Sequence, residues 1–378
     1  MKILICLLAI IITTNIIQLL SKINAYLCNV FLTLLYPYFR KNSNNINNNI
    51  CINIIISKKI CYNILGDNMK ELKIHFLNTI WSDAIILENN NHYGFVDTGS
   101  KFYYPMVEKH LNDLNIKELE FIVLTHFHND HYGNIINIIS NYSVNRLYLK
   151  HYYGLDGTTS SGTTSNDEYT ENETKVYNEI LELCKVKNVD VVYIDDFNKY
   201  NYDFDFFGIN IELYDCKNRL YELYSNPDSP NYGEKRFNEN FNSIAVFIKV
   251  NGYNIFLGAD VTCSSYELED VKELSIKMIK TIYDKHNIDH IDLYKSCHHG
   301  GTGTNTLPLC NLLKAKYAVI TNTARWLDGY KTFEYLKEAN NDVDILVTDH
   351  QKYIFTINDN ISYEKIIDES LFLLLNKD

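Results

Sequence analysis

The pattern of apolar positions changes character near residue 70. Residues 3–20 form an uncharged, mostly apolar run of 18 residues, and residues 24–39 form a second uncharged run rich in aromatic side chains. A polar, Asn-rich stretch follows at 42–49. Beyond residue 70, short apolar strands alternate with segments of helical spacing, which is typical of a compact α/β domain. The chain therefore divides into a hydrophobic, Asn-rich N-terminal extension, residues 1–68, and a folded domain, residues 69–378.

The folded domain has two halves of similar pattern, each beginning with strands and continuing with interleaved helices. In the second half, two apolar runs flank Asn251-Gly252, the strongest short hairpin signal in the chain. This order predicts two sheets packed between layers of helices. The predicted strands are 72–77, 84–87, 93–96, 121–124, 146–149, 189–194, 206–213, 244–250, 253–257, 291–294, 317–321, 345–348 and 353–357. The predicted helices are 105–114, 131–139, 173–185, 265–285, 307–314 and 332–338.

The N-terminal extension has two interpretations. The first apolar run is long enough for an export signal or a marginal membrane span. Alternatively, Gly66-Asp67-Asn68 can be encoded by a purine-rich ribosome-binding sequence just before Met69, which makes Met69 the natural start. The protein is then cytoplasmic, and residues 1–68 are upstream sequence translated with it. A membrane-anchored or exported protein, and any membrane partner, is expected only if residues 1–40 are a genuine anchor.

Composition narrows the class of partner. Residues 69–378 carry 29 basic and 46 acidic residues, a formal net charge of −17, whereas residues 1–68 carry +5. A strongly acidic globule repels phosphate backbones, so broad nucleic-acid binding is not expected. A local site for a small-molecule or phosphoester substrate is compatible with this charge. The number of cysteines, nine, is odd and no pair is spaced C-x-x-C, so the pattern suggests neither a disulfide framework nor a cysteine zinc cage.

The strongest chemical signal is the segment Thr125-His126-Phe127-His128-Asn129-Asp130-His131. It follows a buried apolar run and holds three imidazoles and one carboxylate within six residues. In an extended segment His126 and His128 point to the same side, so both can bind one ion. Asp130 and His131 follow where the chain turns into a helix, and they can reach a second ion. Imidazole and carboxylate ligands favour Zn²⁺, with Mn²⁺ or Fe²⁺ as alternatives.

His126-x-His128-x-Asp130-His131 resembles the signature of the metallo-β-lactamase superfamily. Asp97 after an early strand, Asp260 after a later one, and a late histidine follow in the same order. The resemblance implies a four-layer αββα sandwich with two divalent metal ions. It implies that His126 and His128 bind the first ion, that Asp130 and His131 bind the second, and that Asp260 bridges them. Asp97 would orient one of the ligands.

Three shorter segments narrow the resemblance to the hydrolase domain of the ComEC competence DNA-uptake family. They are Ile74-His75-Phe76-Leu77-Asn78 with Ser82-Asp83-Ala84, then Asn242-Ser243-Ile244-Ala245-Val246, and finally His298-His299-Gly300-Gly301. The chain lacks the many membrane spans of the DNA channel, so it resembles a stand-alone relative of that domain.

One ligand of the superfamily pattern is missing. Many members place a histidine of the first site shortly before the bridging aspartate, but no histidine lies between His151 and His286. Asn240, Asn242, another oxygen donor or a folded-in His151 could fill that position, and an open or weak first site is the expectation. The absence argues against a β-lactamase.

The adjacent histidines 298 and 299 receive different roles. Neighbouring side chains at a strand end point to opposite sides, so only one of them is expected to bind metal. The alternation of Tyr294 and Ser296 continues to His298, which is therefore predicted to be the metal ligand of the second site. His299 is predicted to donate a proton to the leaving group.

The predicted function is that of a metal-dependent hydrolase. A hydroxide that bridges the two ions is the expected nucleophile, and Asp130 orients it. The reaction then needs no serine or cysteine nucleophile, and the sequence supports none. The ComEC-like segments favour a phosphodiester or another phosphoester. The alternatives are a lactone, thioester or carboxylic ester hydrolase, or a catalytically weak metal-binding domain that serves interactions.

Overall fold

The computed structural model describes residues 70–152, 154, 166–194, 201–215, 227–228, 239–262, 274–323 and 331–368. Residues 71–378 form one compact unit, which is described here. Among the described residues, no helix is both long and apolar enough to cross a membrane. The apolar runs at 3–20 and 24–39 lie outside the described residues. The domain boundary at residue 68 and both interpretations of the extension therefore stay predictions.

Two large sheets make up the centre of this unit. The first has the strand order β17-β16-β1-β2-β3-β5-β7-β8 and the second β15-β14-β13-β12-β11-β10-β9, while β4 and β6 form a small separate ribbon. The strands of the first sheet are β1 Leu72–Phe76, β2 Ala84–Asn89, β3 His92–Thr98, β5 Phe121–Val123, β7 Arg146–Leu149, β8 Asp190–Tyr193, β16 Gln351–Ile357 and β17 Ile361–Ile367. Those of the second are β9 Asn201–Phe206, β10 Ile209–Asp215, β11 Ile244–Val250, β12 Tyr253–Leu257, β13 Leu293–Lys295, β14 Tyr317–Ile320 and β15 Asp344–Val347; the ribbon is β4 Glu118–Leu119 and β6 Ser143–Val144.

Each large sheet changes from antiparallel to parallel pairing along its width. In the first, β16, β1, β2 and β3 pair antiparallel, and β3, β5, β7 and β8 pair parallel. In the second, β9 to β12 pair antiparallel and β12 to β15 pair parallel. Parallel strands need crossover connections, which helices supply in both halves. The two halves therefore repeat one architecture.

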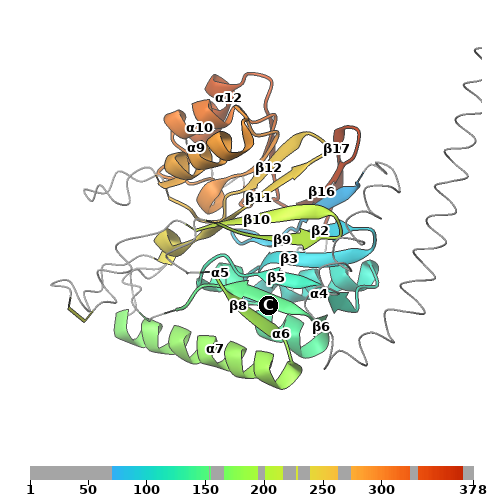
Figure 1. Cartoon of the computed structure of the whole chain (residues 1–378), viewed down its shortest axis with the longest axis vertical. Helices are drawn as coiled ribbons and strands as arrows, with labels where there is room; N and C mark the ends of the chain where they lie inside the picture. The colour runs from blue at the N-terminus through green and yellow to red at the C-terminus, as the bar shows by residue number, and fades with distance from the viewer. Residues whose placement is uncertain are drawn as a thin grey trace, which may run out of the picture. The chain divides into compact units, whose positions relative to one another are not determined.

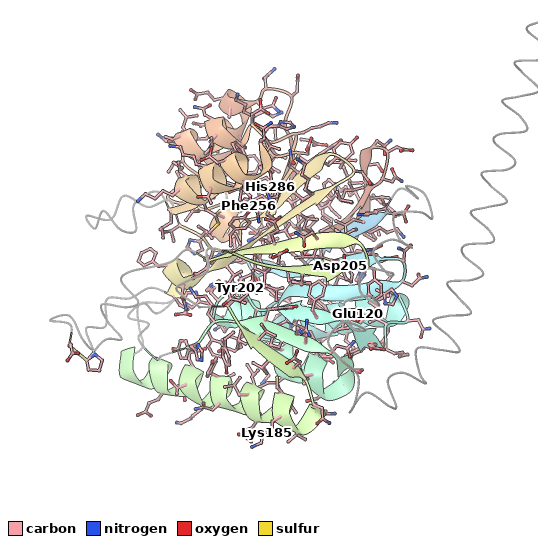
Figure 2. The ribbon with its side chains drawn as sticks, viewed as in Figure 1. Glu120, Lys185, Tyr202, Asp205, Phe256 and His286 are labelled. Carbon is pink, nitrogen blue, oxygen red and sulfur yellow. The ribbon has the colours of Figure 1, made fainter. Side chains whose placement is uncertain are left out.

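Helices cover the outer face of each sheet, which gives four layers (Figure 1). The first sheet is covered by α4 Tyr104–Asp113, α6 Ile135–Asn141 and α7 Asn166–Lys187, and α5 Asn129–Tyr132 follows β5. The second sheet is covered by α9 Leu274–His286, α10 Leu307–Leu313 and α12 Thr332–Ala339. Lys185 points outward from α7, while Phe256 on β12 lies inside the second half (Figure 2). This arrangement confirms the predicted αββα sandwich.

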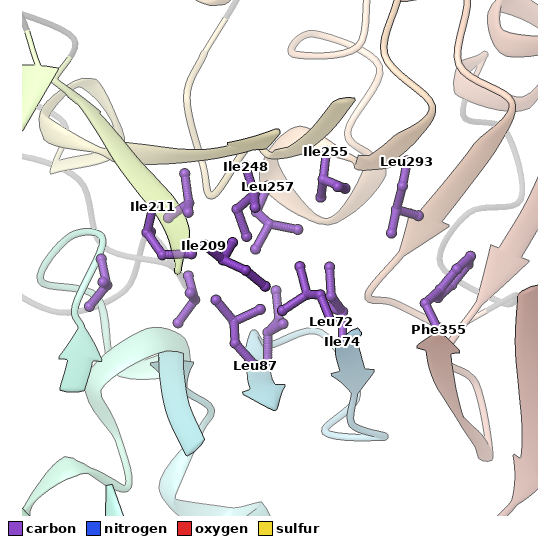
Figure 3. Packing of buried hydrophobic residues seen from close by; sticks show 14 of the residues in the cluster. Leu72, Ile74, Leu87, Ile209, Ile211, Ile248, Ile255, Leu257, Leu293 and Phe355 are labelled. Atoms are coloured by element: carbon purple, nitrogen blue, oxygen red, sulfur yellow. The ribbon is translucent and has the colours of Figure 1, made fainter. Parts of the chain in front are cut away.

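The inner faces of the two sheets pack on each other through aliphatic side chains (Figure 3). Leu72 and Ile74 of β1 and Leu87 of β2 belong to the same cluster as Ile211 and Ile255 of the second sheet, and all five are fully buried. Because both faces of each sheet are buried, the sequences of these strands are nearly continuous apolar runs. This central cluster fixes the two sheets, and therefore their strand ends, relative to each other.

Most predicted elements appear within one or two residues of their expected ends, and the 244–250/253–257 hairpin matches β11 and β12 residue for residue. The predicted helix 131–139 is wrong, because α5 and α6 are separate helices with Gly133 between them. A Cβ atom at Gly133 would lie only 2.4 Å from the backbone nitrogen of Lys101, so the chain needs glycine at this close approach.

The predicted single strand 206–213 is also wrong. The chain reverses at Phe207-Gly208, where both residues have positive φ (51° and 88°), so the segment is a hairpin of β9 and β10. The sequence analysis did not predict β17, which is an edge strand of the first sheet. The start of the predicted helix 265–285 lies outside the described residues.

Truncating the core between the sheets should lower stability strongly. Phe355 of β16 is fully buried in the inter-sheet cluster, so Phe355→Ala is expected to lower the free energy of unfolding by about 3–5 kcal/mol. Phe102, whose side chain is 57% exposed, provides a matched control, and Phe102→Ala should change it by less than about 0.5 kcal/mol. Urea unfolding measures both variants. Equal losses would contradict the placement of the core.

Candidate metal centre

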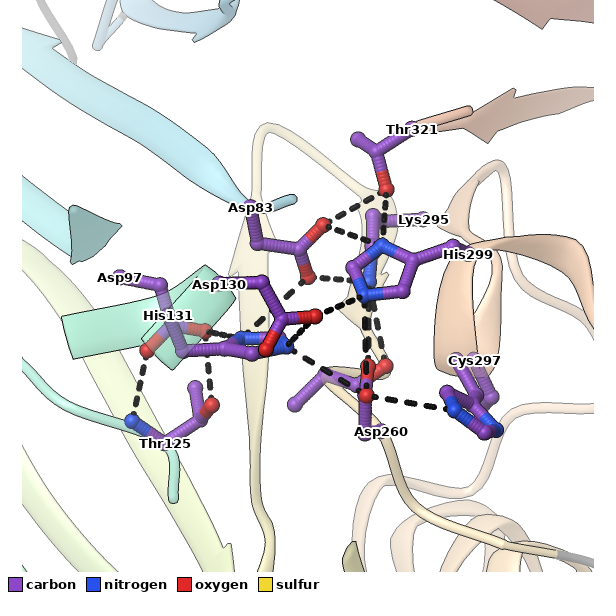
Figure 4. Close-up of polar contacts among 12 residues, drawn as sticks. Asp83, Asp97, Thr125, Asp130, His131, Asp260, Lys295, Cys297, His299 and Thr321 are labelled. Carbon is purple, nitrogen blue, oxygen red and sulfur yellow. Dashed lines mark hydrogen bonds and ion pairs between the residues drawn. The ribbon is translucent and has the colours of Figure 1, made fainter. Parts of the chain in front are cut away.

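The polar residues singled out in the sequence gather at the carboxyl ends of the parallel strands. Asp97 lies at the end of β3, and His126 follows β5 in the first sheet. Asp260 follows β12, and His299 follows β13 in the second sheet. Because the carboxyl ends of parallel strands meet at one edge of a sheet, ligands collect there in open α/β sheets. Here the edges of both sheets contribute to one centre (Figure 4).

The first group of ligand atoms comes from His126, His128 and Asp260, which lie within 4.8 Å of one another. His126 Nε2 is 3.1 Å from His128 Nδ1 and 3.8 Å from Asp260 Oδ2. Two nitrogen ligands on one tetrahedral zinc ion are about 3.4 Å apart, given Zn–N distances of about 2.1 Å. The spacing of this group therefore fits a shared ion.

The second group consists of Asp130, His131, Asp260 and His299. His299 Nε2 lies 3.1 Å from Asp130 Oδ2, and His131 Nε2 lies 3.7 Å from the same oxygen. Asp260 belongs to both groups, which is the position the sequence analysis gave to the bridging ligand. The grouping brings together the predicted pairs His126/His128 and Asp130/His131.

One oxygen atom, Asp260 Oδ2, faces the Nε2 atoms of four histidines. The distances are 3.4 Å to His131, 3.6 Å to His299, and 3.8 Å to both His126 and His298. All four are longer than a good N–H···O hydrogen bond. Four imidazoles around one carboxylate oxygen at such distances leave room for cations between them.

Hydrogen bonds on the far side of each ring fix which nitrogen points into the centre. Asp97 Oδ2 accepts a hydrogen bond from His131 Nδ1 at 2.7 Å, because a carboxylate can only accept. The Thr125 hydroxyl donates to the same oxygen at 2.7 Å, so it accepts from His126 Nδ1 at 3.1 Å. In the neutral form of each ring, the Nε2 lone pair is therefore directed at the centre. This is the orienting role predicted for Asp97, which extends through Thr125 to a second ligand.

The same device recurs in the second half of the chain. The Thr321 hydroxyl donates to Asp83 Oδ1 at 2.6 Å and therefore accepts from His299 Nδ1 at 3.1 Å. Asp83 with Thr321 thus orients His299 as Asp97 with Thr125 orients His126. The sequence analysis did not identify Thr125 or Thr321, since each acts through contacts between segments far apart in the sequence.

Lys295 is a buried cation beside these carboxylates, and the sequence analysis missed it. Its ammonium group pairs with Asp83, donates to the Ala259 carbonyl at 3.1 Å and lies 4.0 Å from Asp260 Oδ1. Burial acts to lower its pKa, but Asp83 and Asp260 raise it above the ordinary value, so the charge is retained. A lysine at the end of an apolar strand, four residues before His299, was the available signal.

The centre contains buried atoms that fit a bound cation. His131 Nε2 and Asp260 Oδ1 are buried and make no hydrogen bond within the part of the chain that the structure describes. Buried polar atoms without partners are costly, and here they belong to residue types that ligate divalent metals. The donor set, imidazole and carboxylate with no thiolate in either group, suits Zn²⁺, Mn²⁺ or Fe²⁺.

The charges of the centre are strongly coupled. Burial disfavours an imidazolium at His299, yet Asp260, Asp83 and Asp130 together raise its pKa to about 9. Burial lowers the pKa of His126 well below its ordinary value, and the nearby rings of His131 and His128 lower it further. The pKa of Asp260 lies well below its ordinary value, because His299, His131 and His298 outweigh the opposing effect of burial. The Asp260 carboxylate is therefore charged and ready to bind a cation.

The two adjacent histidines occupy different places from those the strand alternation predicts. β13 ends at Lys295, and residues 297–300 form a short 3₁₀ turn in which His298 and His299 both have positive φ (46° and 49°). The alternation through Tyr294 and Ser296 therefore does not continue. His299 is buried in the second group, whereas the His298 side chain is 42% exposed.

The other candidates for the missing ligand have the following contacts. The His151 ring stacks on Tyr193 with centroids 3.8 Å apart. The Asn242 side-chain nitrogen donates to Glu239 Oε1 at 2.9 Å, while its Oδ1 atom is buried and makes no hydrogen bond within the described residues. Asn240 Nδ2 lies 3.3 Å from His298 Nε2, which places Asn240 beside the centre but in contact with a histidine.

Residues 82–190 match the family model described as the metallo-beta-lactamase superfamily. Among solved structures, similar chains include the metallo-beta-lactamase fold protein YhfI from Bacillus subtilis, at 9% identity and a TM-score of 0.44, covering 78% of this chain and 100% of that one. A diphosphatase from the PhnP family has 12% identity, a TM-score of 0.38 and coverages of 77% and 99%. A putative metallo-beta-lactamase from Thermotoga maritima has 17% identity, a TM-score of 0.34 and coverages of 59% and 94%. No curated protein matches the sequence. The finer resemblance to the ComEC hydrolase domain stays a prediction.

Replacing Asp97 by asparagine should weaken metal binding without removing a ligand. The amide can no longer hold His131 Nδ1–H as a carboxylate does, so the Nε2 lone pair loses its fixed direction. Asp97→Asn is expected to lower zinc affinity about 10–100-fold, measured by competition with a chelator of known affinity. The exposed Asp113→Asn serves as the control. Unchanged affinity in Asp97→Asn would contradict the orienting role.

Metal affinity should rise with pH. The metal-free His299 ring holds a proton up to a pKa of about 9, and a bound cation must displace that proton. Zinc affinity is therefore expected to increase by up to about tenfold per pH unit for each proton displaced, between about pH 6.5 and 8.5. Calorimetry in two buffers of different ionisation enthalpy counts the protons released. Binding without proton release would show that His299 does not take part.

Proposed function

We propose that this chain, whose residues 82–190 match the family model of the metallo-beta-lactamase superfamily, is a metallo-hydrolase that uses a two-metal centre to cleave a phosphodiester or another small phosphoester. The observation that carries the proposal is the meeting of two ligand groups at Asp260, whose Oδ2 atom faces histidines from both. A carboxylate shared by two groups is what a pair of ions at a short separation requires.

Each residue of the centre has a separate task. His126, His128 and Asp260 would hold the first ion, and Asp130, His131, Asp260 and His299 the second. Divalent ions bound there supply a nucleophile from water at neutral pH and neutralise charge that develops on the scissile group. Asp97, Thr125, Thr321 and Asp83 keep the histidine rings in the orientation that binding needs.

Asp130 is the residue suited to orient the attacking water. Its side chain is 26% exposed, in contrast to the fully buried His131 and the almost fully buried Asp260. Its Oδ2 atom lies 3.1 Å from His299 Nε2. A carboxylate in that position accepts a hydrogen bond from a water molecule and so directs a lone pair of the water oxygen at the substrate.

The geometry favours a change in the roles first predicted for the adjacent histidines. His299 has its Nδ1 atom engaged by Thr321 and its Nε2 atom among the second group, so we assign it as a metal ligand. A ring held in this way is poorly placed to donate a proton to a leaving group. His298, whose side chain is 42% exposed, is then available for another role.

The charge of the centre favours an anionic substrate. The four carboxylates and one ammonium of the centre carry −3 together, so two bound divalent ions would raise the sum to +1 before a hydroxide is counted; the residues are Asp83, Asp97, Asp130, Asp260 and Lys295. A phosphoester carries negative charge in its ground state, whereas a lactone or thioester does not. The net charge of −17 on residues 69–378 opposes long polynucleotides, so a small phosphoester fits best.

A substrate panel tests the proposed function. Phosphodiesters, phosphomonoesters, lactones and thioesters are compared with Zn²⁺ and with Mn²⁺, and the phosphoesters are expected to be hydrolysed at least about tenfold faster. Asp260→Ala should lower that activity about 10³-fold, because both ions lose their shared ligand. The exposed Asp342→Ala should retain it. Preferential cleavage of lactones or thioesters would replace the proposed substrate class, and full activity in Asp260→Ala would remove the shared-ligand mechanism.

A further inference from the structure

The two ligand groups at the centre are unequal. The second group offers four side chains, whereas the first offers His126, His128 and the Asp260 carboxylate that it shares. Sequence analysis had identified this deficit as the histidine missing between His151 and His286. The geometry of this chain therefore has to provide a further ligand for the first site, and its identification rests on the proposed two-metal function.

His298 lies where a further ligand is needed. Its Nε2 atom is 3.8 Å from Asp260 Oδ2, the same distance that separates this oxygen from His126 Nε2. His298 is not among the atoms that already lie within 4.8 Å of His126 and His128. Its side chain is 42% exposed, so rotation about its side-chain bonds is not blocked by tight packing.

The backbone explains how two adjacent histidines can serve two sites. Consecutive residues in the left-handed region do not alternate as strand residues do, and the rings of His298 and His299 are 6.0 Å apart at an angle of 58°. Both nevertheless approach Asp260 Oδ2. Two strained residues in a row are costly, and such strain is found where function requires it.

The turn that carries both rings is held firmly. The His298 N–H donates to the Ala259 carbonyl at 2.9 Å, which ties the turn to the residue before Asp260. The side-chain amide of Asn305 donates to the Cys297 carbonyl at 2.8 Å, and that of Asn322 donates to the His299 carbonyl at 2.8 Å. A ligand on a fixed backbone binds metal at a smaller entropic cost than one on a mobile loop.

We infer that His298 supplies the missing protein ligand of the first metal site, so that the adjacent histidines 298 and 299 each bind a different ion. The first site then holds three imidazoles, from His126, His128 and His298, in addition to Asp260. Many superfamily members place the corresponding histidine shortly before the bridging aspartate. In this chain the ligand comes instead from the turn after β13.

Asn240 competes with the metal in this arrangement. Its Nδ2 atom lies 3.3 Å from His298 Nε2, the nitrogen that would bind the ion. An imidazole nitrogen has one lone pair, so it cannot accept from Asn240 and bind a cation together. The amide therefore has to leave His298 when the first ion binds, and removing the amide should not weaken that binding.

Metal titration of the full-length chain tests the inference. The metal-free protein and three variants, His298→Ala, Asn240→Ala and His151→Ala, are titrated with Zn²⁺ against a competing chelator. His298→Ala is expected to weaken one of two binding steps about a hundredfold or more and to leave the other unchanged. Asn240→Ala and His151→Ala should keep both steps, with the affinity in Asn240→Ala equal or higher. The visible spectrum of the Co²⁺-loaded protein should change only in His298→Ala, because only there does the ligand set change.

The outcomes separate this inference from the proposed function. Two unchanged steps in His298→Ala overturn the inference, and loss of one step in Asn240→Ala or His151→Ala assigns the ligand to that residue instead. A native chain that binds fewer than two ions contradicts the two-metal function itself. Near-ultraviolet circular dichroism confirms the fold of each variant, and His298→Gln repeats the measurement if the alanine variant does not fold.

Discussion

The burial of the Asp260 carboxylate is the constraint on which the rest of the centre depends. A buried carboxylate is costly unless charges and hydrogen-bond donors compensate it, and this one is almost completely buried. The compensating groups come from both halves of the chain: His126 and His131 follow β5 of the first sheet, and Lys295 and His299 lie at the end of β13 in the second. The strand ends of the two sheets must therefore be correctly positioned relative to each other for the buried carboxylate to be tolerated. This requirement couples the fold to the chemistry of the site.

Backbone strain is concentrated at the same place. Asp97, Ala259, His298 and His299 all have positive φ, although none is glycine. The central apolar cluster between the sheets holds the strand ends from which these residues emerge, so it can stabilise conformations that an isolated loop would not keep. The same rigidity lets two threonine hydroxyls, each committed to a carboxylate, orient histidines on opposite sides of the centre.

The features that sequence could predict are those encoded locally. The segment from His126 to His131 carries its ligands within six residues, and the hairpin of β11 and β12 is signalled by Asn251-Gly252 between two apolar runs. Thr125 and Thr321 act through contacts between distant segments, so no local pattern distinguishes them. Lys295 was marked only by its place at the end of an apolar strand. The roles of His298 and His299 depend on where β13 ends, and strand ends are poorly defined by alternation alone. The hairpin at Phe207-Gly208 was missed because its turn has an aromatic residue at a left-handed position.

Anomalous diffraction from a crystal of the zinc-loaded protein tests the central claim most directly. Data collected at the zinc absorption edge should show two peaks about 3.5–4 Å apart, each within about 2.0–2.2 Å of a carboxylate oxygen of Asp260. One peak should lie beside His126 and His128, and the other beside His131 and His299. A single peak, or two peaks of which only one contacts Asp260, would contradict the shared-ligand centre.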